Sequence, residues 1–146
     1  MDRGKPGCKR HLVTDRNGVP LGLFLSPANL HDSMGMVPTL DAIPPVRGRR
    51  GRPRRRPGKL HADKGYDYAR CRRDCRARGI KPRIARRGID SSQRLGRHRW
   101  VIERTLAWFA RFRRLTVRYE RRQDIWTAFH SLAAALICHK TLSASF

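Results

Sequence analysis

The sequence predicts an α/β fold in a single domain over residues 1–146, and three observations lead to that prediction. A hairpin signal near the N-terminus indicates two antiparallel strands. A strand, a helix and a second strand then follow one another between residues 60 and 85, and two helices with apolar faces occupy residues 93–139. Because the strand, helix, strand order requires a crossover connection, we expect parallel strands in one sheet.

The chain is strongly basic. It has 34 Lys and Arg against 11 Asp and Glu, a formal net charge of +23, while 39% of its 146 residues are hydrophobic. That apolar content supports a folded core, and that charge favours nucleic acid as the partner. No apolar run approaches the roughly 20 residues of a membrane span, and the N-terminus lacks the apolar core of a signal peptide. We therefore expect a soluble cytoplasmic protein with no membrane contact.

The first elements are a hairpin and a helix. Lys9–Asp15 and Val19–Leu25 flank Asn17-Gly18, and Asn-Gly between two apolar stretches is a strong signal for a tight turn. Apolar residues at a three-residue spacing then predict a helix over His31–Ile43. Asp32 near its start is a suitable helix opener.

A basic loop separates these elements from the next strand. Residues 44–59 contain seven Arg, four Pro and three Gly in 16 positions, which suits neither a helix nor a core face. We expect a flexible basic loop there. Beyond it, Leu60–Asp63 and Lys81–Ala85 are the predicted parallel strands, and the helix Tyr68–Arg78 between them ends at Gly79.

Two helices complete the predicted domain. Apolar residues at helical spacing predict the longest helix from Gln93 to about Arg114 and a last helix from Asp124 to about His139. The four cysteines are too irregular for a disulfide framework or a zinc site. Reduced thiols are the expectation.

Two carboxylates stand out among the many cations. Asp63 follows a predicted strand, at the sheet edge where α/β folds place their sites. Glu103 lies on the long helix with Arg99 one turn before it and Arg111 two turns after it, on one predicted stripe. Each residue also has a purely structural interpretation. Asp63 could cap the turn at Lys64-Gly65, and Glu103 could form a surface ion pair with Arg99 worth about 0.3 to 0.5 kcal/mol.

Several blocks of sequence carry a family resemblance. They are GKPGCKRHL at 4–12, DxxGxPL at 15–21, ANxHD at 28–32, ADKGYD at 62–67, and RWVIERTxAWFxRFRRL with RYER at 99–121. In wording and order they resemble bacterial insertion-sequence transposases of the DDE type, and more narrowly the insertion-sequence-five group. The resemblance covers nearly the whole chain.

The resemblance implies a ribonuclease-H-like (RNase H-like) fold. In that fold three carboxylates hold two Mg²⁺ or Mn²⁺ ions that cut and rejoin DNA during transposition. By match with the family motifs, Asp63 is the second catalytic acid and Glu103 the third, and both are metal ligands. Hard ions of this kind prefer oxygen ligands. The implied partner is DNA, both the insertion-sequence ends and the target, and a homo-oligomer is compatible with the sequence.

The first catalytic acid of the family has no clear counterpart here. In the family it lies on a central strand upstream of the Gly-Lys-Pro-Gly block. Asp2 is too close to the start of the chain for that place, and Asp15 is expected at the hairpin tip. We therefore expect a C-terminal portion of a transposase that lacks the first strand and is inactive alone.

Positive side chains are the expected DNA contacts, and His31 is an expected neighbour of the site. The candidates for DNA binding are Arg99, Arg104 and Arg111 on the long helix and Arg54, Arg55 and Arg56 in the basic loop. The resemblance also implies a bacterial cytoplasm with association to the nucleoid. The alternative hypothesis is a non-catalytic basic nucleic-acid-binding protein, in which the acids only cap and pair.

Overall fold

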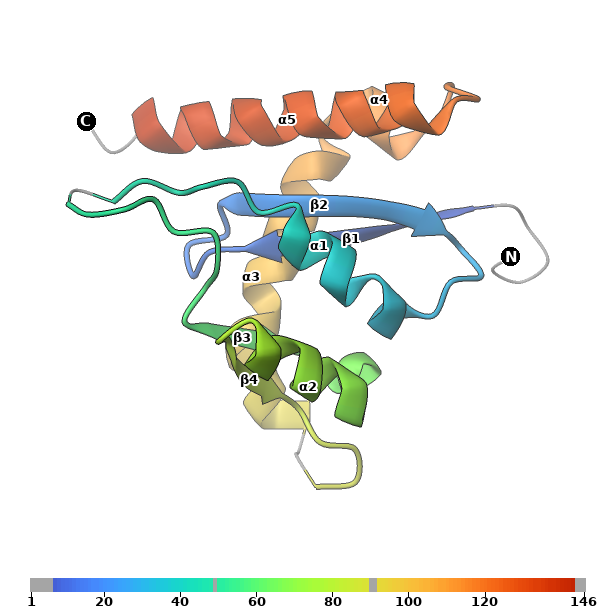
Figure 1. Ribbon diagram of the computed structural model, residues 1–146. Coiled ribbons are helices and arrows are strands. Elements are labelled where there is room, and N and C mark those ends of the chain that lie inside the picture. The colour runs from blue at the N-terminus through green and yellow to red at the C-terminus, as the bar shows by residue number, and fades with distance from the viewer. Residues whose placement is uncertain (1–6, 49, 90–91, 144–146) are drawn as a thin grey trace.

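The computed structural model describes residues 7–48, 50–89 and 92–143, with side chains from Arg99 onward in the last of these segments. It is a mixed α/β structure with two small sheets, and a long helix crosses behind both of them (Figure 1). Within these segments no helix is both long and apolar enough to cross a membrane.

The predicted hairpin is confirmed. Strands β1 (Cys8–Thr14) and β2 (Pro20–Pro27) pair in antiparallel register, with Leu12 opposite Leu23. Gly18 adopts φ +82°, a left-handed conformation that glycine tolerates. The Asp15 carboxylate accepts hydrogen bonds of 2.8 Å from the backbone N–H groups of Asn17 and Val19, so Asp15 closes the hairpin tip as expected.

The predicted helix over residues 31–43 is divided into two short pieces. A 3₁₀ turn, η1 (Asp32–Met34), leads into α1 (Met36–Asp41). His31, and not Asp32, caps η1, because its side chain accepts from the Ser33 N–H. The segment that follows, up to Lys59, contains no helix within its described residues, in keeping with its Pro and Gly content.

The parallel strand pair is also confirmed. Strand β3 (Lys59–Ala62), the 3₁₀ turn η2 (Lys64–Tyr66), helix α2 (Ala69–Ala77) and strand β4 (Lys81–Ile84) follow in order, and β3 pairs with β4 in parallel. Gly79, at φ +68°, ends α2 as predicted.

The predicted long helix is shorter than expected. Helix α3 (Ser92–Ala110) ends before Arg111, and a separate turn, α4 (Arg113–Thr116), follows. Phe109 and Leu115 are both buried in one cluster. On a continuous helix the two side chains would lie about 120° apart around the axis, and the break after Ala110 lets both face the same core. The last helix, α5 (Gln123–Ser143), has 21 residues against 19 in α3, so it is the longest helix among the described residues, contrary to expectation.

One core joins the two sheets. Helices α1 and α2 bury Met36, Leu40, Cys71, Cys75 and neighbouring residues, and partly buried side chains from β1, β2 and β3 pack against this cluster. Within the described residues the hairpin and the parallel pair form two separate two-stranded sheets. A second cluster joins α3 and α4 to α5, which lies across one end of the molecule (Figure 1).

Candidate active site

Asp63 lies directly after β3, at the carboxyl end of the parallel pair. Its backbone is extended, and its carboxylate accepts a hydrogen bond of 2.9 Å from the Gly65 N–H, which caps η2. The side chain is exposed. Asp63 thus fills the capping role that the sequence allowed, at the sheet edge where a catalytic acid was expected.

Asp32 acts electrostatically on the same tyrosine as Asp63. Tyr66 is partly buried, and desolvation by that burial raises the pKa of its hydroxyl to about 12, with smaller contributions from the negative charges of Asp32 and Asp63. Asp32 also forms an ion pair of 2.9 Å with Lys9. The sequence pattern suggested a helix-opening role for Asp32, and its ion pair with Lys9 was not foreseen.

Asp67 holds together the segment that follows Asp63. Arg72 forms an ion pair of 2.5 Å with its carboxylate, and the backbone N–H of Arg87 donates to its other oxygen at 2.8 Å. The Arg87 hydrogen bond, followed by that of Arg72, holds the pKa of Asp67 below its usual range. The ADKGYD block therefore contains one exposed acid and one acid fixed in an ion pair.

His31 contacts Tyr68, the residue that follows this segment. Its Nε2 lies 3.1 Å from the Tyr68 hydroxyl, and the two rings meet edge to face with centroids 5.2 Å apart. Arg87 donates to the same hydroxyl at 3.2 Å and lies over the Tyr68 ring. These contacts connect the N-cap of η1, His31, to the N-cap of α2, Tyr68. Neither Tyr68 nor Arg87 stood out in the sequence, although Tyr68 directly follows the ADKGYD block.

Glu103 lies on the exposed side of α3. Arg99 Nε donates to Glu103 Oε1 at 2.7 Å, and the two side chains are 71% and 56% exposed. The pair is thus the surface i, i+4 ion pair that the sequence allowed. Arg111 lies beyond the end of α3, so the predicted stripe of three residues contains only Arg99 and Glu103.

The residues after Glu103 attach α3 to the hairpin tip. Arg104 donates to the Asn17 carbonyl oxygen, and its guanidinium lies over both the Trp100 and Trp108 rings, 4.5 and 5.0 Å from their centroids. Arg104 Nε is buried and without a hydrogen-bond partner. One hydrogen bond and two aromatic rings therefore hold the Arg104 guanidinium within the fold.

The arginines of the basic loop differ in their surroundings. Arg54 forms a backbone bridge with Val46, and the side chains of Arg54 and Arg55 are exposed. Arg56 donates to the Arg78 carbonyl oxygen at 2.9 Å and lies against Gly79 at the end of α2. Arg54 and Arg55 are therefore better placed to reach a phosphate than Arg56.

Comparison with known proteins identifies the family. The model of the transposase DDE domain matches residues 1–138. The chain belongs to this family. A protein of Burkholderia cepacia named as a transposase for insertion sequence element IS402 is 52% identical over 141 residues, which are 97% of this chain and 67% of that protein. No solved structure matches the chain.

DDE transposases act on DNA by phosphoryl transfer and in general use divalent metal ions. Asp63 and Glu103 supply hard oxygen donors of the kind Mg²⁺ and Mn²⁺ prefer. Within the described segments, however, no group of three or more His, Cys, Asp and Glu side chains is arranged to hold a metal ion. Asp15 is committed to the hairpin tip, and Asp2 lies outside the described residues. Asp63 and Glu103 therefore fit a metal ion by the chemistry of their oxygens, and neither Asp15 nor a described residue beside them completes a group of three ligands.

Proposed function

We propose that Asp63 and Glu103 are two of the three carboxylates of a DDE transposase centre that cuts insertion-sequence ends and joins them to target DNA. The observation that carries the proposal is the position of Asp63. It is an exposed carboxylate at the carboxyl end of a parallel strand pair, inside the ADKGYD block of a chain that belongs to this family. Mg²⁺ or Mn²⁺ held there would activate the attacking oxygen and stabilise the leaving oxygen.

The residues of this chain have separate roles in the proposal. Asp63 and Glu103 supply oxygens to the ions. Arg99 pairs with the Glu103 carboxylate in the absence of metal. Because an exposed ion pair of this kind is weak, a metal ion could displace Arg99 from Glu103. The hydrogen bond from the Gly65 N–H fixes the orientation of the Asp63 carboxylate.

The third carboxylate, in our proposal, comes from a strand that joins the two sheets into one RNase H-like sheet. The two sheets already pack against a common core, and each strand has one unpaired edge within the described residues. Isolated two-stranded sheets are marginally stable, so an added central strand would stabilise both. The matched relative extends beyond the aligned region, which covers 67% of its length. Without that strand the chain would hold two ions poorly and leave DNA uncut.

DNA would approach over a basic surface. Arg54 and Arg55 of the basic loop, Arg99 beside Glu103 and Arg111 after the end of α3 are exposed cations that could neutralise phosphates. Arg104, which already binds the hairpin tip, would contribute positive charge more than a direct contact. This surface, together with the chemistry of the site, supports nucleoid-associated DNA as the substrate.

Metal binding and DNA cleavage test the proposal. Binding of Mn²⁺ to the chain, followed by electron paramagnetic resonance, should weaken in Asp63→Asn and in Glu103→Gln. It should remain unchanged in Asp41→Asn, which removes an exposed carboxylate paired with Arg78. A version extended upstream should cleave DNA only with a divalent ion and should lose cleavage in either site variant. Cleavage that persists in both variants would overturn the assignment.

A further inference from the structure

The basic loop over residues 44–59 extends away from the two sheets to a narrow tip (Figure 1). Two backbone hydrogen bonds of 2.8 Å join Val46 to Arg54 near the base of the loop. All described residues from 44 to 56 are exposed. The part of the loop beyond the bridge between Val46 and Arg54 is therefore accessible to a partner.

The charge of this loop favours a polyanion as that partner. Residues 44–59 contain seven Arg and one Lys, and there is no Asp or Glu from residue 42 to residue 62. Arg50 and Arg52 make no hydrogen bond, ion pair or ring contact with any other described residue, whereas Arg56 donates to the Arg78 carbonyl oxygen. Within the described structure, the guanidinium groups of Arg50 and Arg52 are thus available for binding, and DNA is the polyanion on which this family acts.

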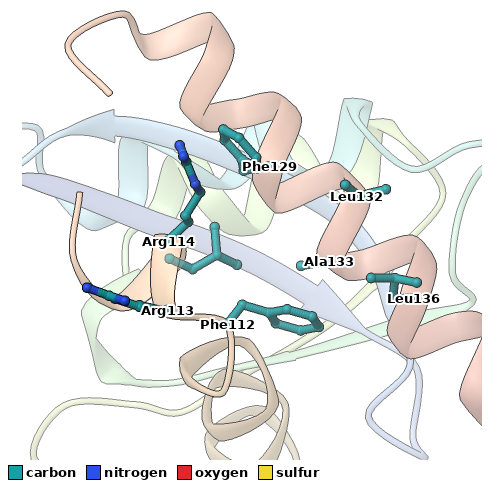
Figure 2. A pocket seen from close by; sticks show the side chains of 8 residues that line it. Phe112, Arg113, Arg114, Phe129, Leu132, Ala133 and Leu136 are labelled. Carbon is teal, nitrogen blue, oxygen red and sulfur yellow. The ribbon is translucent and has the colours of Figure 1, made fainter. Parts of the chain in front are cut away.

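A second place where arginines gather is less suited to reading DNA. A groove of about 220 Å³ between α4 and α5 has Arg113 and Arg114 at its border (Figure 2). Phe129 and Leu136 of α5 line this groove with apolar groups, which carry no donor for the acceptors of a base edge. The basic loop is therefore the better candidate for a contact with bases.

Gly51 separates the two arginines and has open space where a side chain would stand. Its φ is +91°, and a Cβ added there would meet no atom within 4 Å. A residue without a side chain lets the backbone come close to another molecule. Pro53 follows Arg52 and restricts Arg52 to extended backbone, which lowers the entropy lost when the segment is held by a ligand. The order Arg, Gly, Arg, Pro thus places two cations beside a point of close backbone approach.

This order of residues suits the minor groove of DNA better than the major groove. The major groove is about 12 Å wide and takes a helix or a two-stranded ribbon, whereas the minor groove is about 6 Å wide and excludes a helix. At A·T pairs the base edges in the minor groove carry only acceptors, and a guanidinium carries only donors. At G·C pairs the guanine amino group adds a donor, which opposes an arginine. Narrow A·T-rich minor grooves also concentrate negative potential, which attracts arginine.

We propose that Arg50, Gly51 and Arg52 enter the minor groove of A·T-rich duplex DNA, where the two guanidinium groups bind the acceptor edges of the bases. The inference rests on DNA as the partner in the proposed function and does not depend on a metal at Asp63. The loop leads into β3 at the end opposite Asp63, so the groove contact is separate from the proposed metal centre. It gives the chain a preference for base composition that phosphate contacts alone cannot supply.

Fluorescence anisotropy of the full chain with three duplexes of equal length tests the proposal, in enough salt to weaken non-specific phosphate binding. The duplexes contain A·T pairs, G·C pairs or inosine·cytosine pairs. Inosine·cytosine pairs have the major-groove edge of G·C and lack the guanine amino group in the minor groove. We expect the A·T and inosine·cytosine duplexes to bind about tenfold more tightly than the G·C duplex. Equal affinity for all three would overturn the proposal, as would inosine·cytosine binding like G·C. Absence of binding to any duplex would overturn it together with the proposed DNA surface.

Two double variants separate groove contact from loss of charge. Arg50→Ala/Arg52→Ala should abolish the preference for A·T and inosine·cytosine duplexes. Arg54→Ala/Arg55→Ala removes the same charge from the same loop and is the matched control. It should weaken binding to all three duplexes alike and retain the preference, because phosphate contacts do not distinguish bases. A preference that persists in Arg50→Ala/Arg52→Ala would refute the groove contact.

A glycine variant tests the close approach of the backbone. Gly51→Ala places a methyl group between the backbone and the floor of the groove, so it should also abolish the preference. Gly88→Ala is the control for backbone strain, because Gly88 has φ +76° and equally open space, and it should retain the preference. Circular dichroism checks that both variants are folded. An unchanged preference in Gly51→Ala would show that the backbone does not reach the groove floor.

Binding of Mn²⁺ distinguishes this inference from the proposed metal centre. A chain that prefers A·T duplexes and binds no Mn²⁺ would refute the metal centre and support the groove contact. A chain that binds Mn²⁺ through Asp63 and shows no preference among the duplexes would refute the groove contact alone.

Discussion

The hydroxyl of Thr105 donates a hydrogen bond of 2.7 Å to the carbonyl oxygen of Gly18, and the Thr105 side chain is fully buried. This contact joins α3 to the tip of the hairpin across 87 residues of sequence. It lies two residues beyond Glu103. The position of the proposed metal ligand relative to the hairpin therefore depends on a buried polar contact.

Replacing Thr105 should destabilise the fold. Thr105→Val keeps the shape of the side chain and leaves the Gly18 carbonyl oxygen without its donor, which should cost about 1 to 3 kcal/mol. Thr105→Ser retains the hydroxyl and should cost less. Urea denaturation of the two variants measures the difference, and equal stability of Val and Ser at this position would contradict the importance of the hydrogen bond.

Gly18→Ala should be more damaging than the same change at Gly51. Both glycines have positive φ, +82° and +91°, so each substitution carries the cost of a left-handed alanine, about 1 to 2 kcal/mol. At Gly18 the new Cβ would also come within 2.9 Å of Thr105 Oγ1, whereas at Gly51 it meets nothing within 4 Å. The difference between the two variants in denaturant midpoint isolates the contact with α3. A smaller loss at Gly18 than at Gly51 would contradict this packing.

Tyr66 should titrate unusually late. Burial, aided by Asp32 and Asp63, raises the pKa of its hydroxyl to about 12, from an unfolded value near 10. The protonated form is favoured in the fold, so its contribution to stability is complete below the unfolded pKa and is lost as the pH rises through the folded pKa. Absorbance of tyrosinate should show a last step near pH 12 that is absent in Tyr66→Phe. Asp32→Asn should move this step to lower pH, and Asp63→Asn should move it by less.

Asp67→Asn should destabilise the chain most at neutral pH. The Arg87 N–H and Arg72 lower the pKa of Asp67, so its carboxylate stabilises the fold above its unfolded pKa. That stabilisation is lost as the pH falls through the lowered folded pKa. The difference in urea midpoint between Asp67→Asn and the parent chain should therefore shrink towards acid pH. A difference that is independent of pH would argue against this ion pair.

Removing exposed arginines should reduce the salt dependence of DNA binding. If Arg54 and Arg55 each neutralise one phosphate, the double change to alanine should lower the slope of log affinity against log salt by about 1.8 for duplex DNA. Arg78, which forms an ion pair of 3.2 Å with Asp41, provides a control for the loss of charge. An unchanged slope in Arg54→Ala/Arg55→Ala would show that these two arginines do not contact DNA phosphates.

Local sequence signals predicted the secondary-structure elements well, and they predicted less well how those elements pack against one another. Asn17-Gly18 fixed the hairpin, and Gly79 fixed the end of α2, because turn chemistry depends on neighbouring residues alone. The predicted end of α3 lay several residues beyond the observed one. The break after Ala110 allows both Phe109 and Leu115 to be buried, and the spacing of apolar residues continues across it, so the sequence pattern does not show the break. The same limit applied to the site. Motifs selected Asp63 and Glu103, whereas the contact of Arg104 with the Asn17 carbonyl depends on residues 87 apart in sequence.

The four cysteines differ in burial, so their reaction with a thiol reagent can measure how often the core opens. Cys71 and Cys75 are sealed in the core that joins the two sheets, and burial raises the pKa of both thiols, while Cys8 and Cys138 are partly accessible. A thiol-specific label should therefore react in two phases, with the slow phase set by the rate at which that core opens. Docking of a further strand between the sheets would lengthen the slow phase, and labelling kinetics would register the assembly without any engineered probe.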